Sequence, residues 1–118
     1  MFENCCLSLV LVDVDPENGL IDLNLVEKAI TPKTKVIIPV HLYGEMVDMR
    51  HLKEIADKHN IKIIEDASHA IGGKYQNQYI GGCQYSDITV FSFHPVKIIT
   101  TGEGGMALTN SAELAERM

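Results

Sequence analysis

Apolar runs of strand length recur along the chain, separated by turn residues and by segments with helical spacing. Five runs have the length and composition of β-strands: residues 7–15 (LSLVLVDVD), 35–40 (KVIIPV), 61–66 (IKIIED), 86–93 (SDITVFSF) and 105–110 (GMALTN). The run at 35–40 is continuously apolar, as expected for a strand covered on both faces. Residues 16–19 (PENG) predict a turn, and residues 75–82 (YQNQYIGG) predict a small hairpin or turn with Asn77 at its bend.

Helical periodicity appears between these runs. A helix is predicted from about Asp48 to His59, because an apolar stripe recurs there at Met49, Leu52, Ile55 and Ala56. Asn60 suits the C-terminal end of that helix. Asp22 can cap a shorter helix, whose apolar face is Leu23, Val26, Ala29 and Ile30. Ser111 can cap a last helix, SAELAERM.

Alternating strands and helices of this kind predict an α/β fold with right-handed crossovers and a mostly parallel sheet. Ligands of such sheets bind beyond the carboxyl ends of the strands. His41, Asp66 and Ser92 all lie at or near predicted strand ends, and Lys97 follows the third. We therefore expect these polar side chains to converge on one edge of the sheet.

Composition narrows the class of protein. A chain of 118 residues with 46% hydrophobic and 22% charged residues is typical of one soluble globular domain. The net charge of −6 argues against a nucleic-acid partner. No apolar run approaches the roughly 20 residues of a membrane helix, and the first residues lack the basic start of a signal peptide. Three cysteines, Cys5, Cys6 and Cys83, predict reduced thiols used as small core residues in the cytoplasm.

Lys97 carries the only formal charge between Ile88 and Gly102. A lysine in an apolar setting can lose its proton and form a Schiff base. The alternative is a lysine whose stem packs against apolar residues while its ammonium group reaches water.

Three further residues have both a chemical and a plain structural interpretation. Asp66 can pair with a pyridinium nitrogen or a metal, or it can cap a helix or form a turn. His69 can stack on a planar ring, or it can be an ordinary loop or core histidine. Ser92 can bind a phosphate, or it can belong to the turn that TTGEGG (100–105) makes into the next strand. That stretch lacks the GK[ST] of a nucleotide-phosphate loop.

A metal site built from His41, His69, His94 and Asp66 is conceivable, but no ligand spacing supports it. Taken together, an amine, a carboxylate for a ring nitrogen, a histidine for the ring and a serine for a phosphate match pyridoxal 5′-phosphate (PLP).

Three motifs resemble the DegT/StrS family of sugar aminotransferases, which are PLP enzymes with the aspartate aminotransferase-like (type I) fold. The motifs are IIPVHLYG (37–44), IIEDASHAIGGKY (63–75) and SDITVFSFHPVKIITTGEGGMALTN (86–110). The first contains His41 and Tyr43, to which the resemblance assigns no role. The resemblance implies a three-layer, mostly parallel sheet, which this chain contains incompletely.

The resemblance also implies a role for each candidate residue. Lys97 matches the lysine that holds PLP covalently and moves a proton during the reaction. Asp66 matches the carboxylate that keeps the pyridine nitrogen protonated, and His69 matches a residue that contacts the ring or its 3′-oxygen. Ser92 matches a phosphate ligand. The implied reaction transfers an amino group from glutamate to a 4-keto sugar nucleotide, within a homodimer whose second subunit completes the site.

Members of that family are much longer. Residues 1–118 are therefore expected to be the central part of the PLP-binding large domain, without its N-terminal segment and the C-terminal small domain. One alternative is a catalytically inactive remnant that at most binds PLP or a partner subunit. Another is a metal-dependent or phosphorylated α/β domain that uses Glu65 and Asp66.

Overall fold

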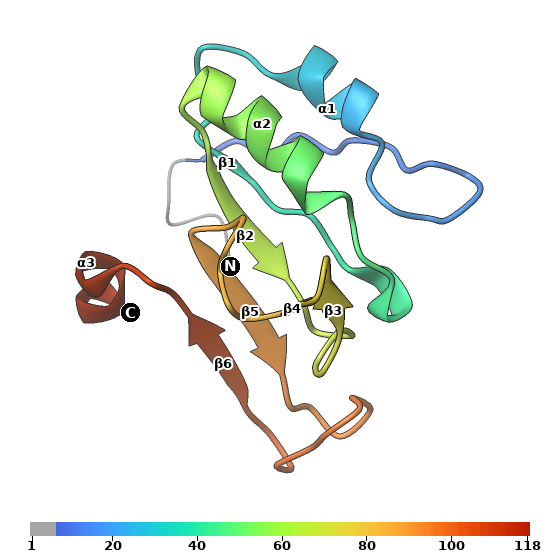
Figure 1. Ribbon diagram of the computed structural model, residues 1–118, viewed down its shortest axis with the longest axis vertical. Coiled ribbons are helices and arrows are strands. Elements are labelled where there is room, and N and C mark those ends of the chain that lie inside the picture. Colours follow the sequence, from blue (N-terminus) through green and yellow to red (C-terminus); the bar gives the residue numbers. More distant parts are fainter. Residues whose placement is uncertain (1–6) are drawn as a thin grey trace.

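The computed structural model describes residues 7–118, which form a four-stranded sheet with two helices packed on one face (Figure 1). The helices are α1 (Leu23–Ala29), α2 (Met49–His59) and α3 (Ala112–Arg117), and a short 3-10 helix, η1, spans Leu42–Gly44. The strands are β1 (Val36–Ile37), β2 (Lys62–Asp66), β3 (Lys74–Tyr75), β4 (Gln78–Tyr79), β5 (Ile88–Ser92) and β6 (Gly105–Leu108).

The sheet has the strand order β1-β2-β5-β6. β1, β2 and β5 are parallel, and β6 runs antiparallel to β5 at the edge. The connection from β1 to β2 contains α2, whereas the connection from β2 to β5 contains the small antiparallel hairpin β3–β4. The predicted mostly parallel sheet is confirmed, and its parallel strands all end at the same edge.

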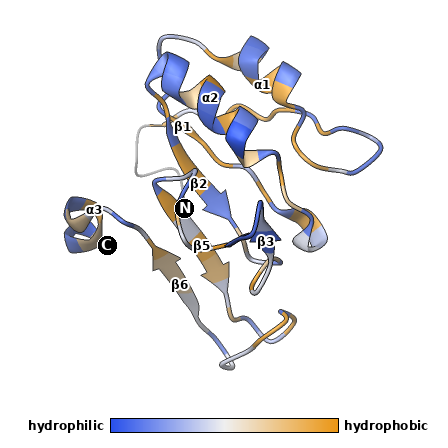
Figure 2. Ribbon diagram, viewed as in Figure 1, coloured by the Kyte–Doolittle hydropathy of each residue, from blue (hydrophilic) through white to orange (hydrophobic). Residues whose placement is uncertain are grey.

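Helix α2 forms where the sequence predicts it, for local reasons. The Asp48 side chain caps its start by accepting a hydrogen bond from the His51 N–H at 3.1 Å. Asn60 ends it in the left-handed conformation, with φ of 55°. Its buried stripe packs with α1 on the apolar side chains of β1 and β2, and the core contains Val26, Ile37, Leu52, Ile55 and Ile63. In Figure 2, α1 and α2 carry both hydrophobic and hydrophilic colouring, as expected for helices with one buried face.

The other short elements also follow their local signals. Asp22 caps α1 and Ser111 caps α3, each accepting a backbone hydrogen bond through its side chain. Gln76 and Asn77 have positive φ angles of 48° and 66° at the bend of the β3–β4 hairpin. Two successive residues of this kind are typical of a tight hairpin turn. The predicted hairpin with Asn77 at its bend is confirmed.

The predicted strand at residues 7–15 is wrong. Only Val14 makes a β-bridge, to Ile21, and Leu9, Val10 and Leu11 are exposed. A strand needs a neighbouring backbone as well as an apolar sequence, and residues 7–118 supply one only at Val14.

The run at 35–40 is shorter and less covered than predicted. Ile37 is buried on the helix side, but Val36, Ile38 and Val40 are exposed on the other face. The ladder to β2 is interrupted at Pro39, which has no N–H to donate, and resumes as an isolated bridge between Val40 and Asp66.

Two further findings concern composition. Cys83 is a half-buried free thiol outside the main core, and Cys5 and Cys6 lie outside the described residues. Within residues 7–118, no helix has the length and apolar character needed to cross a membrane.

Asp87 joins β2 to the start of β5 and generates a pH-dependent prediction. Its carboxylate accepts hydrogen bonds from Lys62 Nζ at 2.8 Å and from the Ile63 N–H at 2.9 Å. Partial burial raises the pKa of Asp87, but these bonds more than offset it and hold the pKa below its ordinary value of 3.8.

We predict that Asp87→Asn lowers the free energy of unfolding at pH 7, because it removes the carboxylate that binds Lys62 and the Ile63 N–H. The loss should be only about 1 kcal/mol, since Lys62 is exposed and the ion pair is weak. The stabilisation by Asp87 is present above the unfolded-state pKa and is lost as pH falls through the lower folded-state pKa. Urea unfolding from pH 7 to pH 2.5 should therefore show the two proteins converging at acid pH. A gap that stays constant over this range would contradict the assignment.

Candidate functional site

The carboxyl edge of the parallel strands brings together the segments that carry the candidate residues. The Asp66 N–H donates to Pro39 O at 2.9 Å, and the His41 N–H donates to Asp66 O at 3.0 Å. Asp66 is also paired with Val90 in the β2–β5 register. The ends of β1, β2 and β5 are thus held at one edge by main-chain hydrogen bonds, as the sequence predicts.

Lys97 lies in the turn after β5 and points back to this edge. Its Nζ lies 3.0 Å from Nε2 of His69, and Lys97 is half-buried while the neighbouring Val96 and Ile98 are exposed. The loop between β5 and β6 shows this hydrophobic stretch clearly (Figure 2). The Lys97 ammonium group therefore contacts the His69 ring. In the alternative interpretation, this group would reach water instead.

His69 leaves one polar atom without a partner. An ammonium group can only donate, so a protonated Lys97 makes Nε2 of His69 the acceptor and places the ring proton on Nδ1. His69 Nδ1 is buried and has no hydrogen-bond partner among residues 7–118. Such an atom is costly to leave unpaired, so its position is suited to a ligand oxygen.

Asp66 and Ser92 lie at the carboxyl ends of β2 and β5, on the same side of the sheet. Both side chains are half-buried and alternate with the buried residues Glu65 and Phe91, which point to the opposite face of the sheet. One carboxylate oxygen of Asp66 accepts the Ser68 N–H at 3.0 Å, which is the predicted turn-forming role. Within residues 7–118, its second oxygen has no hydrogen-bond donor and is available to a ligand. Ser92 Oγ accepts the His94 N–H at 3.4 Å.

Tyr43 is a site residue to which the sequence assigned no role. Its ring stacks on His69, with centroids 6.2 Å apart and an angle of 8° between the planes. Tyr43 has φ of 56° and Gly44 has φ of 84°, so the chain reverses tightly beside His69. The only sequence signal for this arrangement is Gly44, because a Cβ there would lie 3.1 Å from His69 O.

The expectation that the His41 side chain joins Asp66, Ser92 and Lys97 is wrong, because His41 and Glu65 face away from the candidate site. His41 Nε2 donates to Glu65 Oε2 at 2.8 Å on the helix side of the sheet, and both residues are buried. Glu65 and Asp66 therefore point to opposite faces, as their adjacency on a strand predicts. Burial raises the pKa of Glu65, but hydrogen bonds from His41, Ser86 and Thr89 more than offset it, so the pKa lies below its ordinary value.

Among residues 7–118, the residues of the metal-site alternatives are not grouped together. His41 is paired with Glu65, and His94 is on an exposed turn near Glu103. No group of three or more His, Cys, Asp or Glu side chains with metal-binding geometry is found in residues 7–118.

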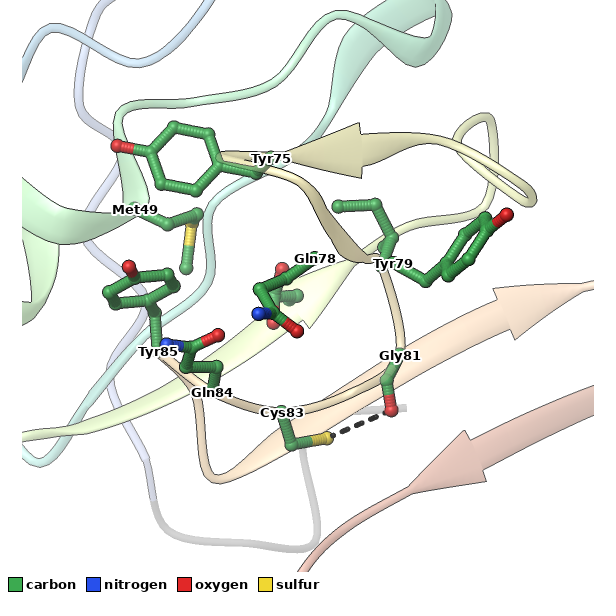
Figure 3. A pocket seen from close by; sticks show the side chains of 10 residues that line it. Met49, Tyr75, Gln78, Tyr79, Gly81, Cys83, Gln84 and Tyr85 are labelled. Atoms are coloured by element: carbon green, nitrogen blue, oxygen red, sulfur yellow. Dashed lines mark hydrogen bonds between the residues drawn. The ribbon is translucent and has the colours of Figure 1, made fainter.

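A small, partly open pocket lies beside the β3–β4 hairpin, and Lys97 does not line it. The residues that line it include Met49, Tyr75, Gln78, Cys83 and Tyr85 (Figure 3). At its edge, Cys83 Sγ lies 3.6 Å from Gly81 O. Its volume is about 20 Å³, which is room for about one water molecule. This pocket is too small for a cofactor, and none of the candidate residues Lys97, His69 and Asp66 lines it.

The parallel sheet thus presents a lysine, a histidine and a strand-end aspartate at its carboxyl edge, where sheets of this kind bind their ligands. The chain belongs to the DegT/DnrJ/EryC1/StrS aminotransferase family, which matches residues 2–118. The fold class predicted from the sequence is confirmed by solved structures of this family.

Three similar proteins illustrate the relationship. GDP-perosamine synthase of Caulobacter vibrioides is 47% identical over 114 residues, which are 97% of this chain and 30% of that protein. The structure of Helicobacter pylori PseC, an aminotransferase involved in pseudaminic acid biosynthesis, is 38% identical with a TM-score of 0.87 and covers 93% of this chain and 29% of that one. Bacillus subtilis NtdA, solved with bound cofactor PMP, is 41% identical with a TM-score of 0.82 and covers 92% and 24%. The chain thus spans less than a third of each of them.

Gly44 provides a test of how closely the loop after β1 packs on His69. Gly44→Ala and Gly72→Ala both place a side chain at positive φ, at 84° and 79°, which costs about 1–2 kcal/mol each. Only Gly44→Ala also brings a Cβ within 3.1 Å of His69 O, whereas a Cβ at Gly72 meets nothing within 4 Å.

We predict that Gly44→Ala lowers the free energy of unfolding by about 1–3 kcal/mol more than Gly72→Ala does. Only Gly44→Ala should shift the NMR signals of the His69 ring, because it moves the backbone that carries that ring. Equal destabilisation and an unchanged His69 signal in both variants would show that the loop does not contact His69 as described.

Proposed function

We propose that this chain is the central part of the PLP-binding large domain of a sugar-nucleotide aminotransferase, and that Lys97 holds the cofactor. The observation that carries the proposal is the contact of Lys97 with His69 at the strand edge that Asp66 occupies. The residues fit PLP because the orphaned Nδ1 of His69 and the second carboxylate oxygen of Asp66 supply a donor and an acceptor beside an amine.

Each residue then has a defined task. PLP, when bound, withdraws electrons from the carbon that carries the transferred amino group. Lys97 would hold the cofactor covalently through Nζ, and its amine, once released, would move a proton at that carbon. Asp66 would keep the ring nitrogen protonated by accepting its hydrogen bond. His69 would contact the ring or its 3′-oxygen, and Ser92 would donate its hydroxyl to the phosphate.

The proposed reaction transfers an amino group from glutamate to a 4-keto sugar nucleotide. The segment FSFHPVKIITTGEGG (91–105) resembles the transaminase of pseudaminic acid biosynthesis, and PseC is a structural neighbour. That similarity favours a 4-keto-6-deoxy-N-acetylhexosamine nucleotide as the amino acceptor in polysaccharide biosynthesis.

A homodimer and a cytoplasmic location complete the proposal. The exposed apolar side chains beside Lys97, at Val96, Ile98 and Ile99, support burial of this loop by a second subunit. The free thiol of Cys83 is consistent with a reducing compartment.

Covalent trapping tests the cofactor site. We predict that PLP added to this chain gives a visible absorbance band, and that borohydride then fixes the cofactor on the peptide that contains Lys97. Lys97→Ala should abolish the modification, whereas Lys74→Ala should leave it unchanged, because Lys74 lies over the Tyr79 ring in the distant hairpin. Mass spectrometry of the digested protein locates the modified residue. Equal labelling of the wild type and Lys97→Ala would refute the site.

An amino-transfer assay tests the activity separately from cofactor binding. With glutamate and a 4-keto sugar nucleotide, we predict formation of the amino sugar that depends on PLP and is abolished by Lys97→Ala. Product is measured by mass spectrometry over many turnovers. Trapping of PLP without any turnover would support the alternative of an inactive remnant that retains only the cofactor site.

A further inference from the structure

Three polar side chains are buried in the described part of the chain, and they form one cluster. His41, Glu65 and Thr89 are exposed by 0%, 5% and 0%, respectively. All three lie on the helix side of the sheet, opposite the surface of Asp66 and Lys97. Burying a charged group is costly unless all of its hydrogen-bonding capacity is used. Their presence in an otherwise apolar layer therefore needs a reason.

The cluster uses nearly all of its hydrogen-bonding capacity. Glu65 Oε2 accepts from His41 Nε2 at 2.8 Å, and Oε1 accepts from Thr89 Oγ1 at 2.9 Å and from Ser86 Oγ. The Val47 N–H donates to Nδ1 of His41 at 3.4 Å. Because Nδ1 is an acceptor, the proton of a neutral imidazole lies on Nε2 and is donated to the carboxylate. One side-chain cluster thus joins β2, β5 and the segment after β1.

This cluster is connected to the candidate site through the backbone. Glu65 precedes Asp66 on β2, and His41 precedes Tyr43 by two residues. The His41 main chain is bonded to Asp66 O, so the same residue is fixed by its backbone at the site edge and by its ring in the core. A change at the His41 ring must therefore act on the position of the loop that carries Tyr43.

The segment after β1 has few backbone bonds to the sheet. β1 has two residues, and Pro39 interrupts its ladder with β2. Tyr43 is 87% exposed, and η1 is a single turn with left-handed backbone at Tyr43. Apart from the side chain of His41, this turn is held by the backbone hydrogen bonds between Asp66 and the segment 39–41 and by the packing of Leu42 against the core.

We propose that His41 and Glu65 are positioning residues for the cofactor site, holding the turn at 41–44 against β2 so that Tyr43, His69 and Asp66 keep their relative places. The inference rests on the proposed function for its effect on PLP, but not for its effect on the loop. Stability alone does not account for the pair, since well-packed apolar residues often stabilise as much as a buried ionic pair.

Four variants separate positioning from stability. His41→Leu removes the donor and leaves the Glu65 carboxylate buried without it. His41→Gln keeps an amide N–H that can reach Glu65. The double variant His41→Leu/Glu65→Met removes both partners together, so neither is left buried without the other. The hydroxyl groups of Ser86 and Thr89, which lie 3.3 Å apart, can then bond to each other. Glu65→Gln retains an acceptor for His41, and the hydroxyl groups of Ser86 and Thr89 can rotate to accept from its amide.

The first measurement is the affinity for PLP, from titration of the absorbance of the Lys97 adduct. We expect His41→Leu and the double variant to bind PLP about tenfold more weakly than the wild type, as is common for residues that orient a ligand-binding group. His41→Gln and Glu65→Gln should stay within about threefold. If the double variant folds as stably as the wild type and also binds PLP equally well, the positioning role is refuted.

The second measurement needs no cofactor. Amide hydrogen exchange of the His41 N–H and of the Glu45 N–H, which bonds to Leu42 O, reports on the turn itself. We expect about tenfold faster exchange at both in the double variant, with the Ala67 N–H, bonded to Val90 O, unchanged as an internal reference. His41→Gln should exchange like the wild type.

The two measurements distinguish the two proposals. If the wild-type chain forms no Lys97 adduct, the proposed function fails, and the exchange rates still decide whether His41 holds the turn. If the exchange rates at His41 and Glu45 are the same in the wild type and the double variant, the inference is overturned whatever the result with PLP. If His41→Leu does not fold, the double variant and His41→Gln carry the comparison.

Discussion

The hydrogen bonds made by the Asp66 main chain are the constraint on which the rest of the site depends. Its N–H binds Pro39 O and its carbonyl binds the His41 N–H, so one residue of β2 fixes both sides of the proline interruption. The Ala67 N–H then binds Val90 O and extends the same edge to β5. Tyr43, His69 and Lys97 each lie in a separate connection between strands. Without these bonds, the segments that carry them would not be held next to one another.

Local signals predicted the elements, and topology predicted where the polar residues meet. Helix α2 followed from its caps and apolar stripe, because Asp48, Asn60 and the stripe act within the helix itself. The meeting of strand ends followed from the parallel order of the sheet. The strand expected at residues 7–15 failed because pairing depends on a neighbouring backbone, and alternation of apolar residues cannot show whether one is present.

The candidate site was predictable as a set of residue types but not as a set of contacts. Lys97, Asp66 and His69 were found because each lies at or after a strand end. Their contacts come from loops 28 residues apart in sequence, as between His69 and Lys97, and no local pattern encodes them. Glu65 left a signal that could have been used. It alternates with Ile61 and Ile63 on the apolar face of β2, so a buried carboxylate with a partner was implied there.

The tight reversal at Tyr43 and Gly44 places two side chains of one short turn in different environments. The His41 ring is in the core and the Tyr43 ring is on the open surface, two residues apart. If the contact of His41 with Glu65 holds the turn in place, thermodynamic linkage applies across the sheet. The free energy by which that contact strengthens ligand binding at Tyr43 and His69 equals the free energy by which the bound ligand strengthens the contact. A ligand bound at His69 would in this way stabilise the contact between His41 and Glu65 in the core, which it does not touch.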